Sequence, residues 1–341
     1  MNALFLTEPG QISLTDVPVP EPGPDEIRLR VAACGICGSD VHGYTGASGR
    51  RIPPLVMGHE AAGTIDAVGA GVTGLAAGQR VALDSTVFCG SCEQCRSGRE
   101  NLCSHRQVLG VSCGDYRRHG CFAEYAIVPA RICYPIPDSL DFPVAALLEP
   151  LTIGLHAINL GCQQGMPRSA VVVGCGMIGL VTVAALAARG VPRIAAIDID
   201  PDRLAEARRH GAAETFDGRE EGAGGRAAAW ATSSADVDGA DLVIEAVGNT
   251  AAVSTAIDAV TRGGSPARTG TGRGRHAPRQ DEPVRVTSRP TAYGVSTTLT
   301  SPGSRLCSRV NHSGPSASGA TRLINLARST LPSAANLIAS G

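Results

Sequence analysis

Four cysteines in one short loop, Cys89, Cys92, Cys95 and Cys103, constrain this chain more than any other feature. Their spacing, C-x2-C-x2-C-x7-C, lets four thiolates converge on one tetrahedral ion, which predicts a structural zinc site. An iron–sulfur cluster is the rival, but the C-x3-C-P ending of the bacterial ferredoxin run is absent. The opening residues, MNALFLTEPG, carry no secretory signal. We therefore expect a reducing, cytoplasmic compartment, in which cysteines spaced this way bind metal and do not form disulfides.

Residues 1 to about 150 read as short strands separated by turns. The strand-like segments are rich in β-branched or apolar residues and are bounded by Gly, Pro or Asp. They lie at 12–20, 26–34, 61–72, 79–85 and 122–130. This pattern predicts a mostly β domain with the four-cysteine loop inserted in it.

From about residue 151 the chain alternates between strand-like and helical patterns. Strand-like runs occupy 171–174, 193–200 and 241–248, and helical patterns occupy 177–190, 201–211 and 251–264. Such alternation predicts βαβ units and a parallel sheet. We therefore predict an α/β protein in which a second domain, residues 151–264, follows the β domain.

A glycine-rich turn joins the first of these strands to its helix. Gly174, Gly176 and Gly179 form G-x-G-x-x-G in the strand–turn–helix context of a dinucleotide-binding Rossmann fold, and Ile178 lies in the same turn. The glycines let the backbone approach a pyrophosphate closely, and the helix N-terminus supplies free N–H groups. The turn is therefore predicted to bind a dinucleotide. A glycine turn that serves only helix–strand packing is the alternative.

Two further residues bear on which dinucleotide binds. Asp198 ends the next strand, where a carboxylate accepts hydrogen bonds from the adenosine ribose hydroxyls. A 2′-phosphate would be repelled there, which favours NAD over NADP. Arg203 counts slightly against this preference, because a guanidinium can accommodate a phosphate.

The β domain also contains a second set of metal-ligand residue types. Cys37, His59 and Glu60 are the main candidates, and Glu149 is a possible further member. One thiolate, one imidazole and one carboxylate leave a coordination position for water or substrate, as in catalytic zinc sites. Cys34 forms a C-x2-C pair with Cys37, so a redox-active pair is the competing interpretation.

Taken together, several motifs resemble one known family. The segments CGICGSD, GHE, the four-cysteine loop, FAEYAIVPA, LLEPL, GCGMIG and AIDID follow in this order. They resemble the zinc-dependent medium-chain dehydrogenase/reductases of the alcohol dehydrogenase superfamily, in the branch of sorbitol (polyol) and threonine dehydrogenases. The resemblance covers residues 1 to about 264. It implies a GroES-like catalytic domain followed by a Rossmann domain, two zinc ions per chain, NAD, and a homo-oligomer.

The resemblance also implies a role for each candidate ligand. Cys37 and His59 correspond to ligands of the catalytic zinc, and Glu60 is a ligand in the polyol branch. Glu149 occupies the place where alcohol dehydrogenases usually have a cysteine, which favours the polyol and threonine branch. Which of the two glutamates binds the metal directly remains open at this stage.

Ser39 and His42 match the positions of the family's proton relay. The implied reaction is reversible oxidation of a secondary alcohol in a polyol-like substrate, as in L-iditol or sorbitol 2-dehydrogenases. The proton would leave through Ser39 towards His42 while hydride passes to the nicotinamide. A threonine 3-dehydrogenase is a second interpretation, and a zinc-binding remnant without activity is a third.

The sequence pattern changes after Gly264. A further apolar strand is expected there, but the next residues are SPARTGTGRGRHAPRQ. Residues 265–341 are rich in Ser, Thr, Arg, Gly and Pro, which is typical of disorder. We hypothesise a reading-frame shift at about residue 264, which would leave the second domain incomplete. A basic nucleic-acid-binding tail is the alternative, but its arginines are dispersed and aromatic residues are scarce.

The overall composition limits the kinds of partner. The net charge of −1 gives no electrostatic footprint for nucleic acid or an anionic membrane. Residues 170–188 lack any charge, but the glycines and neighbouring strand patterns argue against a membrane span. We therefore expect a small-molecule alcohol or polyol as the partner, with neither nucleic acid nor membrane.

Overall fold

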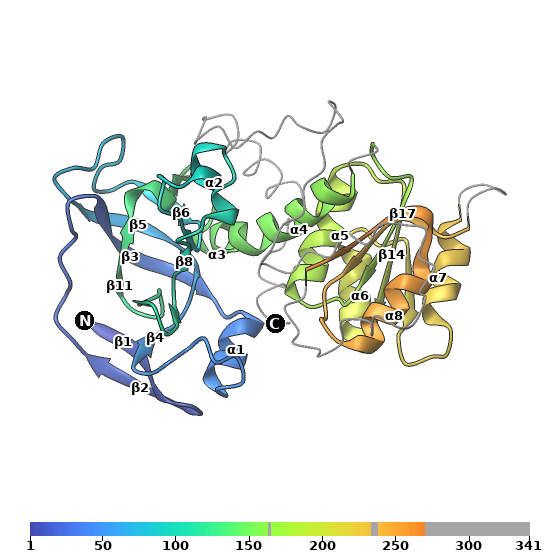
Figure 1. Ribbon diagram of the computed structural model, residues 1–341, viewed down its shortest axis with the longest axis horizontal. Helices are drawn as coiled ribbons and strands as arrows, with labels where there is room; N and C mark the ends of the chain where they lie inside the picture. Colours follow the sequence, from blue (N-terminus) through green and yellow to red (C-terminus); the bar gives the residue numbers. More distant parts are fainter. Residues whose placement is uncertain (163–164, 233–237, 270–341) are drawn as a thin grey trace. The chain divides into compact units, whose positions relative to one another are not determined.

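The structure, a computed structural model, describes residues 1–162, 165–232 and 238–269 of the chain. Within these ranges the chain divides into two units, Met1–Glu149 and the residues from Pro150 onward (Figure 1). The tail that we predicted to be disordered lies outside the described residues from position 270 on.

An antiparallel five-stranded sheet forms the centre of the first unit, with the strand order β11-β3-β5-β6-β12. Alternation along β3 directs Ile27 and Leu29 into a core that also contains Ile65 of β5 and Val81 of β6. The strands are β3 (Glu26–Gly35), β5 (Glu60–Val68), β6 (Arg80–Leu83), β11 (Tyr125–Pro129) and β12 (Cys133–Pro135).

Shorter elements complete the described part of this unit. A three-stranded sheet has the order β2-β1-β4, and β7 pairs with β8 and β9 with β10. These strands are β1 (Asn2–Glu8), β2 (Gln11–Asp16), β4 (Leu55–Val56), β7 (Thr86–Val87), β8 (Gln107–Val108), β9 (Val111–Ser112) and β10 (Arg117–Arg118). The helical pieces are α1 (Gly38–Tyr44), α2 (Glu93–Arg96), α3 (Phe142–Ala146) and the short turns η1 (Glu100–Leu102) and η2 (Ala130–Ile132). The predicted mostly β domain is therefore confirmed.

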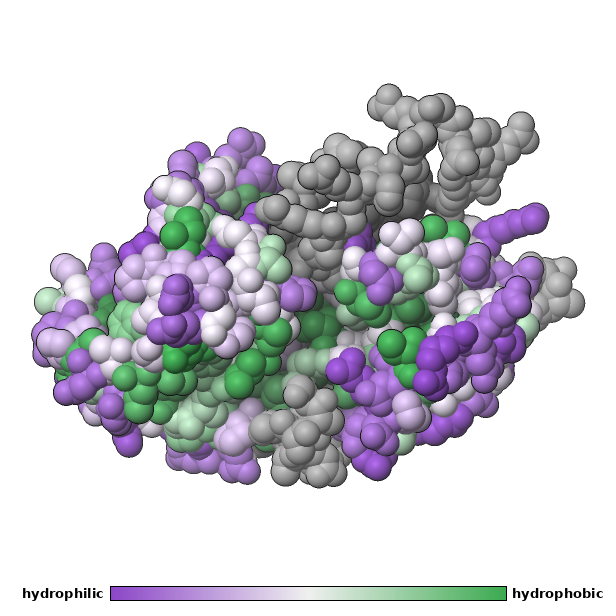
Figure 2. Space-filling view, turned by 90° about the horizontal axis from the view of Figure 1, so that it is seen from below, coloured by the Kyte–Doolittle hydropathy of each residue, from purple (hydrophilic) through white to green (hydrophobic). Residues whose placement is uncertain are grey.

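Large apolar side chains also reach the surface of the first unit. Leu14 on β2 and Ile36 after β3 are exposed by 68% and 76%. The space-filling view likewise shows apolar areas beside polar ones on the face that it draws (Figure 2). The first unit therefore follows the usual rule that burial of apolar residues is incomplete.

Three backbone segments, at Gly58, Gly110 and Gly120, pack closely against one another just before His59. Only glycine leaves enough space for this packing. A Cβ atom on Gly120 would lie 2.1 Å from the carbonyl oxygen of Gly58, and one on Gly110 would lie 2.9 Å from the nitrogen of Gly58. Gly58 has a φ of +88°, which other residues rarely adopt. His59 follows directly, so its position is fixed by packing of main chain on main chain.

A parallel five-stranded sheet forms the second unit, with the strand order β15-β14-β13-β16-β17. Numbered along the chain, this is the order 3-2-1-4-5 of a Rossmann fold. All the residues of β13 are buried, as expected for a strand covered on both faces. The strands are β13 (Ser169–Val173), β14 (Arg193–Asp198), β15 (Glu214–Asp217), β16 (Ala240–Glu245) and β17 (Val260–Arg268).

Helices cover both faces of this sheet (Figure 1). Helices α7 and α8 pack on each other and on β13, while α5 and α6 pack on β13, β14 and β15. The helices of this unit are α5 (Met177–Ala188), α6 (Pro201–Arg209), α7 (Ala223–Ala231) and α8 (Thr250–Ala259), and α4 (Leu148–Gly161) leads into it. The uncharged stretch 170–188 thus forms β13 and α5. No helix in the described ranges has the length and hydropathy of a membrane span.

The end of the described chain differs from the sequence prediction. We expected a helix as far as Gly264 and no strand after it, but α8 ends at Ala259 and β17 continues to Arg268. The β-branched residues Val260 and Thr261 favour an extended backbone, and Gly263 has a φ of +81°, which breaks the helix. Strand β17 pairs in parallel with β16, so the sheet extends one strand further than predicted.

Candidate metal and cofactor sites

The four cysteines of the loop converge as their spacing predicts. Cys92 Sγ lies 3.4 Å from Cys95 Sγ and 3.9 Å from Cys103 Sγ, and Cys89 Sγ lies 3.9 Å from Cys95 Sγ. A tetrahedral zinc ion with Zn–S bonds of about 2.3 Å would hold its sulfurs about 3.8 Å apart. The cysteines in the described ranges are all free thiols, so this cluster is not a set of disulfides.

Local backbone geometry prepares this loop for an ion. The N–H groups of Ser91 and Cys92 donate to Cys89 Sγ at 3.4 and 3.3 Å, and these bonds lower the pKa of Cys89 to about 5. Burial raises the pKa of Cys95 to about 12, so a metal that binds this sulfur must displace its proton. Four sulfur donors at these separations fit a closed structural zinc site.

A second group of ligand atoms belongs to Cys37, His59 and Glu60. One donor atom from each residue lies within 4.8 Å of the other two. Cys37 is the N-cap of α1, His59 follows Gly58, and Glu60 is the first residue of β5. Thiolate, imidazole and carboxylate donors with room for a fourth ligand fit a catalytic zinc.

The carboxylate of Glu60 is buried, and a glycine leaves the space for it. Glu60 pairs in register with Gly35 of β3, and a Cβ atom on Gly35 would lie 2.3 Å from Glu60 Oε2. Burial raises the pKa of Glu60 to about 7, and the charge of Glu149 adds to the shift. A bound cation would favour the ionised carboxylate and thus offset the cost of burial.

Two buried side chains that the sequence analysis missed surround His59. Asp40 Oδ1 lies 3.4 Å from His59 Nδ1, and Asp40 Oδ2 accepts the N–H of Cys37 at 3.1 Å. Arg51 Nη2 lies 3.5 Å from Asp40 Oδ1 and donates to Ser39 Oγ at 3.1 Å. Burial opposes the charged form of His59, but the hydrogen bonds of Asp40 and Cys37 raise its pKa well above its usual value.

The position of Asp40 gave a signal that the sequence analysis did not use. Asp40 is the third residue of α1 after its N-cap, where a carboxylate accepts the cap's own N–H. This arrangement fixes the carboxylate beside the imidazole, and such a partner orients a metal-binding histidine. His59 Nε2 is then left 3.5 Å from Ser39 Oγ.

Two other predicted site residues lie outside the converging group. Glu149 does not join the three described ligand residues, and Ser85 Oγ donates to its Oε1 at 2.6 Å. Burial raises the pKa of Glu149, although the charge of His59 opposes this shift. His42 lies one helical turn after Ser39 on α1, and it is exposed. Glu60 is thus closer to the other ligands than Glu149.

The alternative of a redox-active Cys34–Cys37 pair finds no support in the geometry. Both residues are free thiols, and the Sγ of Cys34 donates to the carbonyl oxygen of Gly35 at 3.7 Å. Burial raises the pKa of Cys34 above that of an ordinary thiol. A reactive thiol requires the opposite shift.

The three glycines of the predicted dinucleotide turn have different roles. Gly174 has a φ of +93°, and a Cβ atom on Gly179 would lie 1.8 Å from the carbonyl oxygen of Gly174. Gly176 is the N-cap of α5, and a Cβ atom on it would meet no neighbouring atom within 4 Å, so its open side is available to a ligand. Ile178 is half-buried in the first turn of α5. This helix N-terminus suits a pyrophosphate.

Asp198 ends β14 and contacts the same turn. Its Oδ2 accepts the N–H of Cys175 at 2.5 Å, and its Oδ1 accepts the N–H of Asp200 at 2.9 Å. The carboxylate therefore joins the glycine turn to the start of α6, beside the predicted pyrophosphate position. Arg203 lies at the start of α6, 3.8 Å from the carboxylate of Asp200, so its guanidinium already has an anionic neighbour.

Two exposed apolar residues at the carboxyl edge of the parallel sheet were also missed. Ile199 and Val247, which follow β14 and β16, are exposed by 63% and 49%. Both lie at the carboxyl edge of the parallel sheet, where nucleotides bind in open α/β folds. Their exposure at this edge indicates a nucleotide-binding surface. The sequence alone does not reveal it, because the strand order must be known first.

Two family models match this chain. The alcohol dehydrogenase GroES-like domain matches residues 23–138, and the zinc-binding dehydrogenase domain matches residues 178–299. The second match continues past Gly264, where we expected the resemblance to end.

Individual relatives cover most of the chain. It is 38% identical to the sorbitol dehydrogenase of Bacillus subtilis (strain 168), over 79% of this chain and 75% of the relative. It is 36% identical to the L-idonate 5-dehydrogenase of Vitis vinifera, over 72% and 67%. An alcohol dehydrogenase from E. coli CFT073, solved with NADH, superposes with a TM-score of 0.71 at 32% identity, covering 80% of this chain and 77% of that chain.

Proposed function

The chain belongs to the zinc-binding alcohol dehydrogenase family, and from this premise we propose that it oxidises a secondary alcohol in a polyol-like substrate with NAD as hydride acceptor. The convergence of Cys37, His59 and Glu60 is the observation that carries the proposal. Similarity to a sorbitol dehydrogenase and to an L-idonate 5-dehydrogenase supports the substrate class. We further propose that the chain acts in the cytoplasm and forms a homo-oligomer.

The metal-site residues divide into ligands and supporting groups. Cys37, His59 and Glu60 would hold a zinc ion, whose Lewis acidity polarises a substrate oxygen and lowers the pKa of its hydroxyl. Asp40 would keep His59 Nδ1 occupied so that Nε2 faces the metal. Ser39 would accept the alcohol proton, and the exposed His42 would pass it to solvent.

The second unit supplies the groups for the dinucleotide. The N-terminus of α5 and the open side of Gly176 would bind the pyrophosphate. Asp198 would accept hydrogen bonds from the adenosine ribose hydroxyls, which supports NAD over NADP. Ile199 and Val247 offer apolar surface to the adenine ring.

A substrate panel tests the reaction. The full chain is loaded with zinc, and NADH formation is followed with sorbitol, L-idonate, L-threonine and a primary alcohol. We expect the highest kcat/KM with a polyol, and activity with threonine alone would favour the threonine 3-dehydrogenase alternative. If zinc binds only at the four-cysteine loop and no alcohol yields NADH, the chain is a non-catalytic remnant.

A matched pair of glycine variants tests the dinucleotide site without activity. Gly176→Ala adds a methyl group on the open side of the turn, where no protein atom lies within 4 Å. We expect it to fold normally and to bind NADH at least tenfold more weakly. Gly179→Ala forces a methyl group against the Gly174 carbonyl, so we expect loss of thermal stability as well. Normal NADH binding by both variants would contradict the proposed site.

A further inference from the structure

A second carboxylate, Asp217, lies next to Asp198 at the carboxyl edge of the parallel sheet. Strands β14 and β15 are parallel, and Asp198 pairs in register with Asp217. Residues in register on neighbouring strands lie about 4.8 Å apart, and their side chains leave the same face. The N–H of Gly218 donates to the carbonyl oxygen of Asp198 at 2.9 Å, which ties the two strand ends together.

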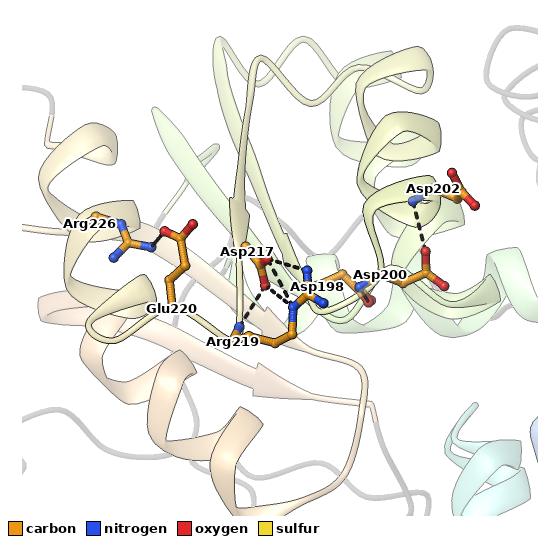
Figure 3. A network of polar contacts seen from close by, with 7 residues as sticks. All are labelled: Asp198, Asp200, Asp202, Asp217, Arg219, Glu220 and Arg226. Atoms are coloured by element: carbon orange, nitrogen blue, oxygen red, sulfur yellow. Dashed lines mark hydrogen bonds and ion pairs between the residues drawn. The ribbon is translucent and has the colours of Figure 1, made fainter.

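Asp217 holds the guanidinium of Arg219 in a closed pair (Figure 3). Arg219 Nη2 donates to Asp217 Oδ2 at 2.6 Å, and Nε lies 3.0 Å from Oδ1. The backbone N–H of Arg219 also donates to Asp217 Oδ1, at 2.9 Å. The hydrogen bonds to Arg219 lower the pKa of Asp217 to about 2, so its carboxylate stays charged near neutral pH. Asp217 is 26% exposed and Arg219 is 63% exposed, so both face solvent at this edge.

The surrounding charges are mixed, with an excess of carboxylates. Six carboxylates and three guanidiniums lie within residues 198–203 and 217–226, at the ends of β14 and β15 and in the segments that follow them, which leaves three negative charges in excess. Most of these residues are drawn in Figure 3. They are Asp198, Asp200, Asp202, Asp217, Glu220 and Glu221 with Arg203, Arg219 and Arg226. A free arginine here would bind a phosphate, but Arg219 and Arg226 are each paired with an acid.

From this arrangement we propose that Asp217 is a second specificity-determining residue, which excludes a 2′-phosphorylated dinucleotide. A phosphate on the ribose oxygen bound by Asp198 would extend towards the neighbouring strand end. There it meets the carboxylate of Asp217, while Nε and Nη2 of Arg219 are held in the ion pair with that same carboxylate. Asp198 thus recognises the ribose hydroxyls. Asp217 rejects the 2′-phosphate by charge repulsion and by pairing with Arg219, the guanidinium that would otherwise bind the phosphate. The inference rests on the proposed function, because it assumes that Asp198 binds the ribose.

Dinucleotide binding by the full-length chain tests this inference. Dissociation constants for NADH and NADPH are measured by nucleotide fluorescence for the parent, Asp217→Asn and Glu220→Gln. A 2′-phosphate carries close to two negative charges, so removal of the carboxylate in register with Asp198 should tighten NADPH binding about tenfold. NADH binding should change less than about twofold, because NADH has no group at this position.

Glu220→Gln is the matched control. It removes a carboxylate from the pair with Arg226, at 2.7 Å, in the loop that follows Asp217. If Asp217 acts through its position, Glu220→Gln leaves the ratio of NADPH to NADH affinity within about twofold. Arg219→Gln should not strengthen NADPH binding, whereas Asp217→Ser should reproduce the gain of Asp217→Asn and serves if the asparagine variant fails to fold.

Different outcomes would refute the role of Asp217 and the proposed function. If the parent binds NADH but the Asp217 variants gain no more NADPH affinity than Glu220→Gln, the role of Asp217 is refuted and the proposed function stands. If the parent binds neither dinucleotide, the proposed function fails, and the inference fails with it. A parent that prefers NADPH would also refute the inference.

Discussion

The two groups of metal-ligand residues are built in opposite ways. The four cysteines of the loop lie in one segment. Backbone N–H groups of the same segment donate to Cys89 Sγ and favour its thiolate form. The Cys37 group instead joins the N-cap of α1 to the start of β5, which only the pairing of β3 with β5 brings together. The first site depends on local spacing, whereas the second depends on the fold around it.

This difference explains the supporting residues. In the loop, the spacing of the cysteines is enough to bring the four sulfurs together, and main-chain N–H groups donate to Cys89 Sγ and Cys103 Sγ. The second site needs Gly35 to leave room for Glu60, Gly58 to direct His59, and Asp40 beside the imidazole. A self-contained metal site therefore adds little constraint elsewhere in the chain, while an assembled site constrains residues on several elements.

The largest effect is expected from Cys95→Ser. It removes a buried sulfur from a closed shell, so the loop should lose its zinc and the chain should bind one ion in place of two. The unfolding free energy should fall by more than about 3 kcal/mol, because metal binding at such sites contributes folding energy. Zinc analysis and thermal melting measure this. Cys113→Ser, a half-buried free cysteine outside both groups, is the control and should keep both ions.

Cys37→Ser should separate the two sites. The assembled site loses its thiolate, so one zinc per chain should disappear while the four-cysteine loop keeps its own. Because the ladder between β3 and β5 and the core behind it hold these strands independently of the thiolate, the unfolding free energy should change by less than about 1 kcal/mol. Zinc content and melting temperature are the measurements. A collapse as large as that of Cys95→Ser would erase the distinction between the two sites.

Glu60→Gln and Glu149→Gln should differ in their effect on the second metal. Glu60 lies in the converging group, whereas Glu149 accepts a hydrogen bond from Ser85. We expect Glu60→Gln to weaken cobalt binding at this site at least 100-fold, and Glu149→Gln less than about tenfold. Competition with a chelator gives the affinities. Equal losses would mean that the two carboxylates share the ion.

A smaller effect is expected from Asp40→Asn. The amide keeps the shape of the side chain but loses the charge beside His59 Nδ1, so metal affinity should fall about 10- to 100-fold. Titration of the second site with cobalt measures the loss, and the four-cysteine loop provides the internal reference. An unchanged affinity would show that packing at Gly58 alone orients His59.

The sequence was sufficient where the signal was local. The four cysteines converge, the glycine turn joins β13 to α5, and Asp198 ends β14, as the sequence pattern predicted, while their binding roles stay predictions. Asp40 and Arg51 were missed because their importance depends on proximity to His59, which lies far along the chain. The capping position of Asp40 is visible in the sequence, but its contact with His59 is not.

The second unit shows the same limit. Strand β15 (ETFD) was not predicted, because its four residues are only half-buried and include two acids. Helix α7 was missed as well, since its paired glycines resemble a loop. Strand β17 contains glycines and Pro266, which are uncommon in strands, so its sequence does not look like one. Proline is tolerated there when its missing N–H is not needed for the ladder.

The pairing of Gly35 with Glu60 affects the order in which the two metal ions bind during folding. The four-cysteine loop closes over a short stretch of chain, so it can capture an ion as soon as the segment emerges from the ribosome. The second ion has no complete shell until β3 and β5 have found their register, because Cys37 and Glu60 belong to opposite sides of that pairing. We therefore expect the two ions to load in sequence during refolding, and the second loading to report the moment at which the β domain becomes native.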